Sequence, residues 1–120
     1  MKILIIDDSS LARRLLRKIL EEENHEIIEA ESGIEGIEKY YLEKPDLVFL
    51  DLTMEGMYGL DALEKIKEID PSAKVVIASA DIQKKTKELA LEKGAYYFIN
   101  KPYDEKEILS LLKNIIGGEK

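Results

Sequence analysis

The sequence predicts an α/β fold in which five parallel strands form one sheet and helices cover both of its faces. Three observations predict it. Short apolar runs alternate five times with stretches of helical periodicity. Three of these runs are continuously apolar, which is typical of strands buried on both faces. Capping residues, prolines and glycines separate the segments, and alternating strands and helices imply parallel strands with right-handed crossovers. At 120 residues, we expect one domain over residues 1–120.

The candidate strands, in chain order, are Lys2–Ile6, Glu26–Glu29, Leu47–Leu50, Lys74–Ala78 and Tyr96–Ile99. The first, third and fourth are continuously apolar and therefore belong in the middle of the sheet. The second is flanked by glutamates and the fifth is mixed, so both are expected at edges. This gives the order 2-1-3-4-5 of a flavodoxin-like, doubly wound sheet. In such sheets ligands bind beyond the strand carboxyl ends where the order reverses, here between strands one and three.

The segments between the strands carry apolar residues at helical spacing. The expected buried faces are Leu11, Leu15, Leu16, Ile19 and Leu20; Ile34, Ile37 and Tyr41; Leu60, Leu63 and Ile66; Ile82, Leu89 and Ala90; and Ile108, Leu111, Leu112, Ile115 and Ile116. Ser32 and Asp104 are each followed three residues later by a glutamate, the spacing of a capping box at a helix start. Helix ends are expected at Lys44-Pro45, Asp70-Pro71, and at Gly94 and Gly117 in left-handed conformation.

Composition excludes several classes of function. The net charge is −7 and the pI about 4.8, which argues against binding to nucleic acid or to a membrane surface. The chain has no cysteine, so disulfides and thiolate chemistry are excluded. No segment is apolar enough to span a bilayer, and the chain runs from Met1 straight into a strand, so we expect a cytoplasmic protein. His25, the single histidine, is expected to be a solvated loop residue.

Polar residues follow four of the strands at the edge where a ligand is expected. Asp7 and Asp8 follow the first strand, Asp51 the third, Ser79 the fourth and Lys101 the fifth. Carboxylates without a nearby histidine or cysteine form a hard-oxygen site that suits Mg²⁺. A lysine and a hydroxyl beside it indicate a dianionic oxygen ligand such as a phosphoryl group. Because Asp51 stands alone on a central strand, it is the better candidate nucleophile for an aspartyl phosphate.

These motifs resemble the receiver domain of two-component response regulators, of the single-domain CheY-like kind. The matching segments are Ile5-Ile6-Asp7-Asp8-Ser9, Asp46 through Asp51, Met54 through Gly59, Ser79-Ala80, and Gly94-Ala95 through Lys101-Pro102. The resemblance covers essentially the whole chain. It implies a phosphoprotein switch that receives its phosphoryl group from a sensor histidine kinase and signals to a downstream protein through the surface of helix four, strand five and helix five. The acidic composition leaves no expectation of direct nucleic-acid or membrane binding, and a monomer and a weak homodimer both remain open.

The resemblance also implies a role for each site residue. Asp51 would be the phosphoacceptor, with Lys101 as the phosphate partner. Asp8, Asp51 and the backbone carbonyl of Thr53 would bind Mg²⁺, with Asp7 acting mostly through water. Ser79 would be the switch hydroxyl and Phe98 the switch aromatic residue, and the Lys101-Pro102 bond would be cis. The protein would catalyse its own phosphotransfer and slow dephosphorylation, without turnover of an external substrate.

The loop after the third strand departs from the family pattern. Glu55 stands where receivers usually have proline, and Tyr58 where they usually have a polar residue.

Two other functions remain open. A Mg²⁺-dependent phosphohydrolase with an aspartyl nucleophile would turn over phosphate esters, although Thr53 stands where such enzymes carry a second aspartate. A non-phosphorylated interaction module on the same scaffold would typically have lost key acids, all of which are present in this chain.

Overall fold

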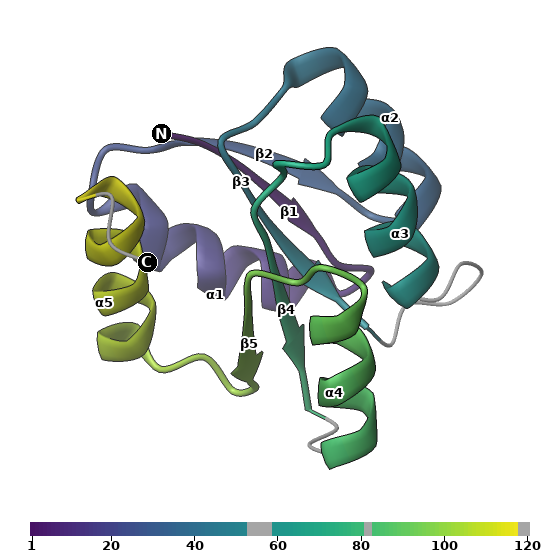
Figure 1. Cartoon of the computed structure of the whole chain (residues 1–120). Coiled ribbons are helices and arrows are strands. Elements are labelled where there is room, and N and C mark those ends of the chain that lie inside the picture. Colours follow the sequence, from purple (N-terminus) through teal and green to yellow (C-terminus); the bar gives the residue numbers. More distant parts are fainter. Residues whose placement is uncertain (53–58, 81–82, 118–120) are drawn as a thin grey trace.

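The computed structural model describes residues 1–52, 59–80 and 83–117 (Figure 1). Its centre is a five-stranded sheet in which every strand pairs in parallel with its neighbours. The strands are β1 (Lys2–Ile6), β2 (Glu26–Ala30), β3 (Leu47–Asp51), β4 (Val75–Ser79) and β5 (Tyr97–Asn100). Their order is β2-β1-β3-β4-β5, which confirms the order predicted from the apolar runs.

Strands β2, β3, β4 and β5 each end one residue later than the sequence predicts. Asp51 pairs with Ala78, and Ser79 pairs with Asn100, so these polar residues belong to the sheet rather than to the loops beyond it. The predicted ends followed hydrophobicity, whereas the actual ends follow the hydrogen-bonded ladder. As a consequence, the backbone positions of Asp51 and Ser79 are fixed by strand pairing.

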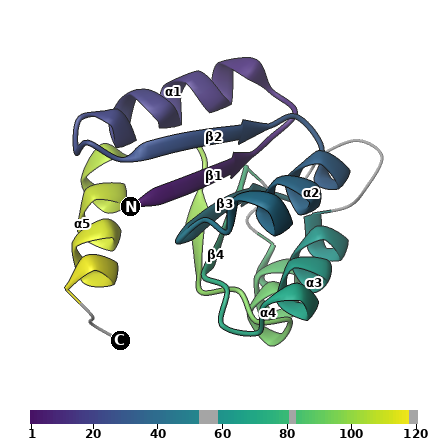
Figure 2. The same cartoon turned by 90° about the horizontal axis from the view of Figure 1, so that it is seen from above.

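Helices cover both faces of the sheet (Figure 2). They are α1 (Ser10–Glu21), α2 (Gly33–Glu43), α3 (Gly59–Ile69), α4 (Lys84–Glu92) and α5 (Glu105–Ile116). Helices α1 and α5 lie on one side, and α2, α3 and α4 on the other. Across the described ranges 1–52, 59–80 and 83–117, no helix is long and apolar enough to cross a membrane.

The strands divide the core into two clusters because successive side chains point to opposite faces. Ile3 and Ile5 of β1 pack in the cluster with residues of α1 and α5. Leu4 and Ile6 pack in the other cluster, with residues of α2 and α3. All of β3 and β4 is buried, whereas β2 and β5 carry exposed residues, as expected for edge strands.

The predicted buried face of α1 is wrong in part. Leu16 and Leu20 are fully buried, but Leu11 and Leu15 are 60% and 51% exposed. The side chain that completes the buried face is Arg13, which is only 8% exposed. Helix α1 is therefore rotated relative to the expected orientation, because a charged side chain has bonding partners beneath it.

The predicted face of α2 is also wrong in part. Ile34 and Tyr41 are exposed, and the helix buries Gly33, Gly36 and Tyr40. A Cβ atom on Gly36 would lie 2.4 Å from Cδ1 of Ile6, so the glycine permits close approach of α2 to β1. The other described faces largely agree, although Leu89 and Ile116 are exposed, and Ile82 lies outside the described residues.

The predicted helix ends are mostly confirmed. Ser32 caps α2 by accepting from the amide of Glu35, as the capping box requires. Asp104 caps α5, but it accepts from the amide of Lys106. Gly94 has a positive φ of 100°, as expected. Gly117 has a φ of −76°, so its predicted left-handed conformation is wrong.

His25 is half-buried, which corrects the expectation of a solvated residue. Its Nδ1 lies 3.0 Å from the amino nitrogen of Met1, and its Nε2 is buried without a hydrogen-bond partner among the described residues. Burial and the adjacent amino group lower the pKa of His25. The ring is therefore held neutral as an acceptor from the amino group.

Candidate functional site

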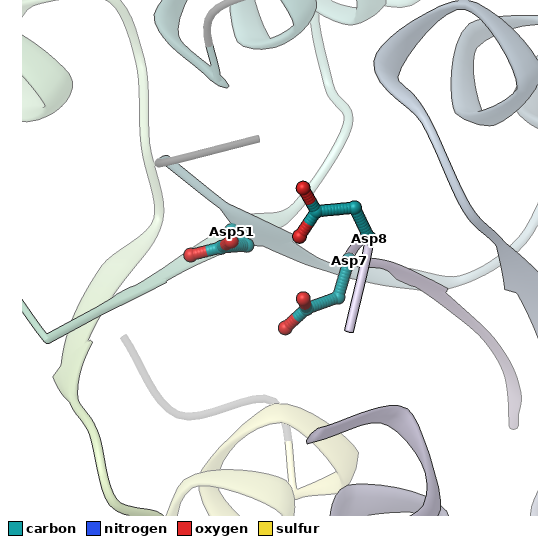
Figure 3. A group of neighbouring side chains, drawn as sticks. All are labelled: Asp7, Asp8 and Asp51. Atoms are coloured by element: carbon teal, nitrogen blue, oxygen red, sulfur yellow. The ribbon is translucent and has the colours of Figure 1, made fainter. Parts of the chain in front are cut away.

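Three carboxylates meet at the carboxyl ends of β1 and β3 (Figure 3). Asp7 and Asp8 directly follow β1, and Asp51 is the last residue of the neighbouring strand β3. One oxygen from each side chain lies within 4.8 Å of the others. Asp7 and Asp51 are buried, at 2% and 4% exposure, whereas Asp8 is exposed. The cluster predicted from two strand ends is therefore a single site with one side open to solvent.

Asp7 is fixed by hydrogen bonds on its backbone and its side chain. Its amide donates to the carbonyl oxygen of Ala30 on β2, over 3.1 Å. Its Oδ1 accepts from the amide of Ser9 at 2.9 Å, and its Oδ2 accepts from the ammonium of Lys101 at 2.7 Å. With a donor bonded to each oxygen, this carboxylate has little freedom to rotate, so the Asp7 side chain is held in one orientation within the site.

Lys101 joins two of the three acids. Its Nζ lies 2.7 Å from Oδ2 of Asp7 and 3.5 Å from Oδ1 of Asp51. Its backbone amide donates to the carbonyl oxygen of Ser79 at 2.9 Å, which fixes the end of β5 against β4. The bond between Lys101 and Pro102 is cis, as expected. The ammonium that the sequence placed at the same sheet edge therefore reaches the cluster directly.

Tyr103 borders the cluster on the side of Lys101. The centre of its ring lies 5.8 Å from the Nζ atom of Lys101, at the outer range of a cation–π contact. Burial raises the pKa of the Tyr103 hydroxyl, and the negative charges of Asp7 and Asp51 raise it further. The phenol therefore stays neutral beside the acids.

Ser79 and Phe98 lie on β4 and β5, the two strands that follow β3 in the sheet. Ser79 is the last residue of β4, one position beyond the residue that pairs with Asp51, and it is completely buried. Phe98 lies on the adjacent strand β5, paired with Ile77, and is 7% exposed. Its side chain belongs to the core cluster that also contains Ala90 of α4. The aromatic ring thus already occupies an inward position in this structure.

The donor set fits a divalent cation. Three carboxylates and one ammonium leave two negative charges at the cluster. The donors are all hard oxygens, the class that Mg²⁺ prefers, and the exposure of Asp8 leaves one side open for water ligands. Thr53, whose carbonyl the sequence also predicts as a ligand, lies outside the described residues, as do Glu55 and Tyr58.

Arg13 is a residue of the site region that the sequence reasoning missed. Its Nη1 donates to the backbone carbonyl of Asp7 at 2.6 Å, and its Nε donates to Oε1 of Glu29 at 2.8 Å. Its spacing from Leu16 and Leu20 placed it on the face that these leucines bury, at i, i+3 and i+7. That spacing was the available signal, but a charged residue is seldom fully buried unless it is paired.

Comparison with known families agrees with this geometry. The profile of the response regulator receiver domain matches residues 3–113. The chemotaxis protein CheY of Listeria monocytogenes is 42% identical over 114 residues, which are 94% of this chain and 96% of that protein. CheY of Halobacterium salinarum is 35% identical over 96% of each chain. These relatives are matched along nearly their whole length.

Solved structures resemble the chain equally well. A CheY from Borrelia burgdorferi, crystallised with CheX, BeF₃ and magnesium, superposes with a TM-score of 0.90 at 34% identity, over 97% of this chain and 89% of the other. A CheY-like receiver domain from Methanospirillum hungatei superposes with a TM-score of 0.92 at 27% identity, over 98% and 94%.

Proposed function

Because this chain belongs to the family of response regulator receiver domains, we propose that it is a switch turned on by phosphorylation of Asp51. The phosphoryl group would come from the phosphohistidine of a sensor histidine kinase. The observation that carries this proposal is the contact of Lys101 with both Asp7 and Asp51, because a phosphoryl group transferred to Asp51 would need a neighbouring cation. The Mg²⁺-bound CheY from Borrelia supports the same assignment.

The reaction is a transfer between two nucleophiles. One carboxylate oxygen of Asp51 attacks the phosphorus atom, a P–O bond forms, and the P–N bond breaks with its electrons passing to the imidazole nitrogen. The product is an acyl phosphate on Asp51. Lys101 compensates the charge of the equatorial oxygens, and strand pairing with Ala78 fixes the backbone that carries the attacking group.

Asp8, Asp51 and the carbonyl of Thr53 would hold Mg²⁺, with Asp7 acting mostly through water. When bound, the metal offsets the charge of the cluster and of the incoming phosphoryl oxygens. Asp7 would also position Lys101, because one of its carboxylate oxygens accepts from that ammonium while the other accepts from the amide of Ser9. The chain's own contribution is therefore positioning and charge compensation rather than proton transfer.

The signal would pass through Ser79 and Phe98 to the outer surface. Ser79 lies one residue beyond the strand partner of Asp51, so a small movement brings its hydroxyl to a phosphoryl oxygen. Movement of Ser79 would change the packing of Phe98 on the adjacent strand, and so the surface of α4, β5 and α5. Exposed Leu91 and Tyr97 give this surface apolar contacts for a downstream protein.

Incubation with Mg²⁺ and beryllofluoride, followed by fluorine NMR, tests the proposal. We expect one stoichiometric adduct in the wild-type protein and none in Asp51→Asn. Acetyl phosphate should add a single phosphoryl mass that the same substitution abolishes. Absence of any adduct would favour the interaction module, and catalytic release of phosphate from esters would favour the phosphohydrolase. A downstream partner protein should bind the beryllofluoride adduct more tightly than the unmodified protein. Equal affinities for the two forms would contradict the switch.

A further inference from the structure

We propose that Arg13 is a positioning residue for the cation site, because it fixes the peptide group that joins Asp7 to Asp8. This inference rests on the proposed function of the acidic cluster as a Mg²⁺ site. Arg13 reaches this cluster at the backbone carbonyl oxygen of Asp7, to which its Nη1 donates. Its effect would therefore pass through the main chain.

The orientation of the Asp7 carbonyl determines where the next residue points. That carbonyl and the amide of Asp8 belong to one planar peptide group. On its other side, the amide of Asp7 is bonded to Ala30 of β2. With the amide and the carbonyl of Asp7 both bonded, the direction in which the Asp8 side chain leaves the main chain is restricted. Asp8 is the exposed acid of the cluster, so it has the least packing of its own to orient it.

Arg13 is itself held firmly. Its Nε bonds to Oε1 of Glu29 at 2.8 Å, while Arg17 approaches Oε2 of the same carboxylate at 3.1 Å. The backbone carbonyl of Glu29 accepts from Lys39 of α2. Residues of α1 and α2 therefore hold Glu29 of β2 in place. The guanidinium of Arg13, which is nine-tenths buried, connects this fixed residue to Asp7.

Positioning and electrostatics predict opposite effects on cation binding. Removing a buried positive charge near three carboxylates should by itself tighten Mg²⁺ binding. Losing a hydrogen bond that orients a ligand-bearing peptide should weaken it, and removal of such supporting contacts typically costs ten- to hundredfold in metal affinity. The sign of the change therefore separates the two roles.

The experiment is calorimetric titration of metal-free protein with Mg²⁺, with circular dichroism showing that each variant is folded. For Arg13→Gln we expect the dissociation constant to rise about tenfold or more. For Arg14→Gln, which removes an exposed positive charge from the same helix, we expect no such rise. In the metal-free state, the amide signal of Asp8 in a ¹⁵N correlation spectrum should move in the Arg13 variant and stay in the control.

Arg13→Lys provides a second variant if the glutamine variant fails to fold. Lysine keeps the charge but lacks the fork that reaches both Asp7 and Glu29, so we expect weaker Mg²⁺ binding than in the wild-type protein. Unchanged or tighter binding in folded Arg13 variants would overturn the positioning role while leaving the proposed function intact. Failure of the wild-type protein to bind Mg²⁺ would overturn the proposed function, and the positioning role with it.

Discussion

Neutralising Asp51 should stabilise the metal-free protein, although the substitution removes the proposed phosphoacceptor. One oxygen of Asp51 lies within 4.8 Å of oxygens of Asp7 and Asp8. At an effective dielectric of 20, each such repulsion is about 3.5 kcal/mol or more. The attraction to Lys101, at 3.5 Å, is about 4.7 kcal/mol on the same scale. Two repulsions exceed one attraction, so Asp51→Asn should raise the free energy of unfolding by about 2 kcal/mol.

The assay is urea unfolding at neutral pH in the presence of a chelator. With an unchanged slope, a gain of this size moves the urea midpoint upward by roughly 1 M. The control is Glu38→Gln, which removes one negative charge from an exposed position on α2 and should change stability by less than about 0.5 kcal/mol. Raised salt should reduce the advantage of Asp51→Asn, because screening weakens the repulsion.

Adding Mg²⁺ should reverse the ranking. At a hundred times its dissociation constant, a ligand stabilises the folded state by about 2.7 kcal/mol. The wild-type protein should gain this stabilisation, whereas Asp51→Asn has lost one of three carboxylates and should gain less. A metal-free Asp51→Asn protein that is no more stable than the wild type would refute the reasoning that the cluster is electrostatically strained.

Three further predictions concern single positions. A Cβ atom at position 59 would lie 2.4 Å from the backbone of Leu52. Gly59→Ala should therefore lower the free energy of unfolding in urea by about 1–3 kcal/mol and weaken beryllofluoride binding, and a neutral effect would contradict this. Burial and Asp70 raise the pKa of Tyr40 to about 12, so only the unfolded chain ionises near pH 10, and wild-type stability should fall between pH 10 and 12 relative to Tyr40→Phe. The lowered pKa of His25 means that the unfolded chain binds a proton first as pH falls below about 6.5. Between pH 7.5 and pH 5.5, the urea midpoint should therefore fall further in the wild type than in His25→Gln. An equal fall in both proteins would exclude His25 as the cause.

The strand order was predictable because burial on both faces leaves a local trace. A central strand of a doubly wound sheet has no polar face, and the continuous apolar runs of β1, β3 and β4 report this directly. The site acids were predictable for a related reason. Each lies at a strand end, and parallel strands bring their carboxyl ends to one edge. The distances at that edge, such as those from Lys101, depend on packing across the whole domain.

The helix faces were harder to predict because their partners are distant in sequence. Arg13 is buried since the carbonyl of Asp7 and the carboxylate of Glu29 lie beneath α1, and nothing in the helix itself indicates them. Gly36 faces the sheet because α2 approaches Ile6 closely, whereas hydrophobicity alone favoured Ile34. In both cases a tertiary contact outweighed the apolar periodicity.

The contact between Lys101 and Asp7 joins positions 94 residues apart in the chain. During synthesis, the three acids leave the ribosome long before the lysine that bridges two of them. A chain that lacks β5 would hold the carboxylates without this ammonium, and its last central strand would have an unpaired edge. Assembly of the acidic site is therefore completed only when the final strand joins the sheet. On the proposed function, a chain without β5 would lack the ammonium that compensates the phosphoryl charge, so its ability to accept a signal would arise only once folding is complete.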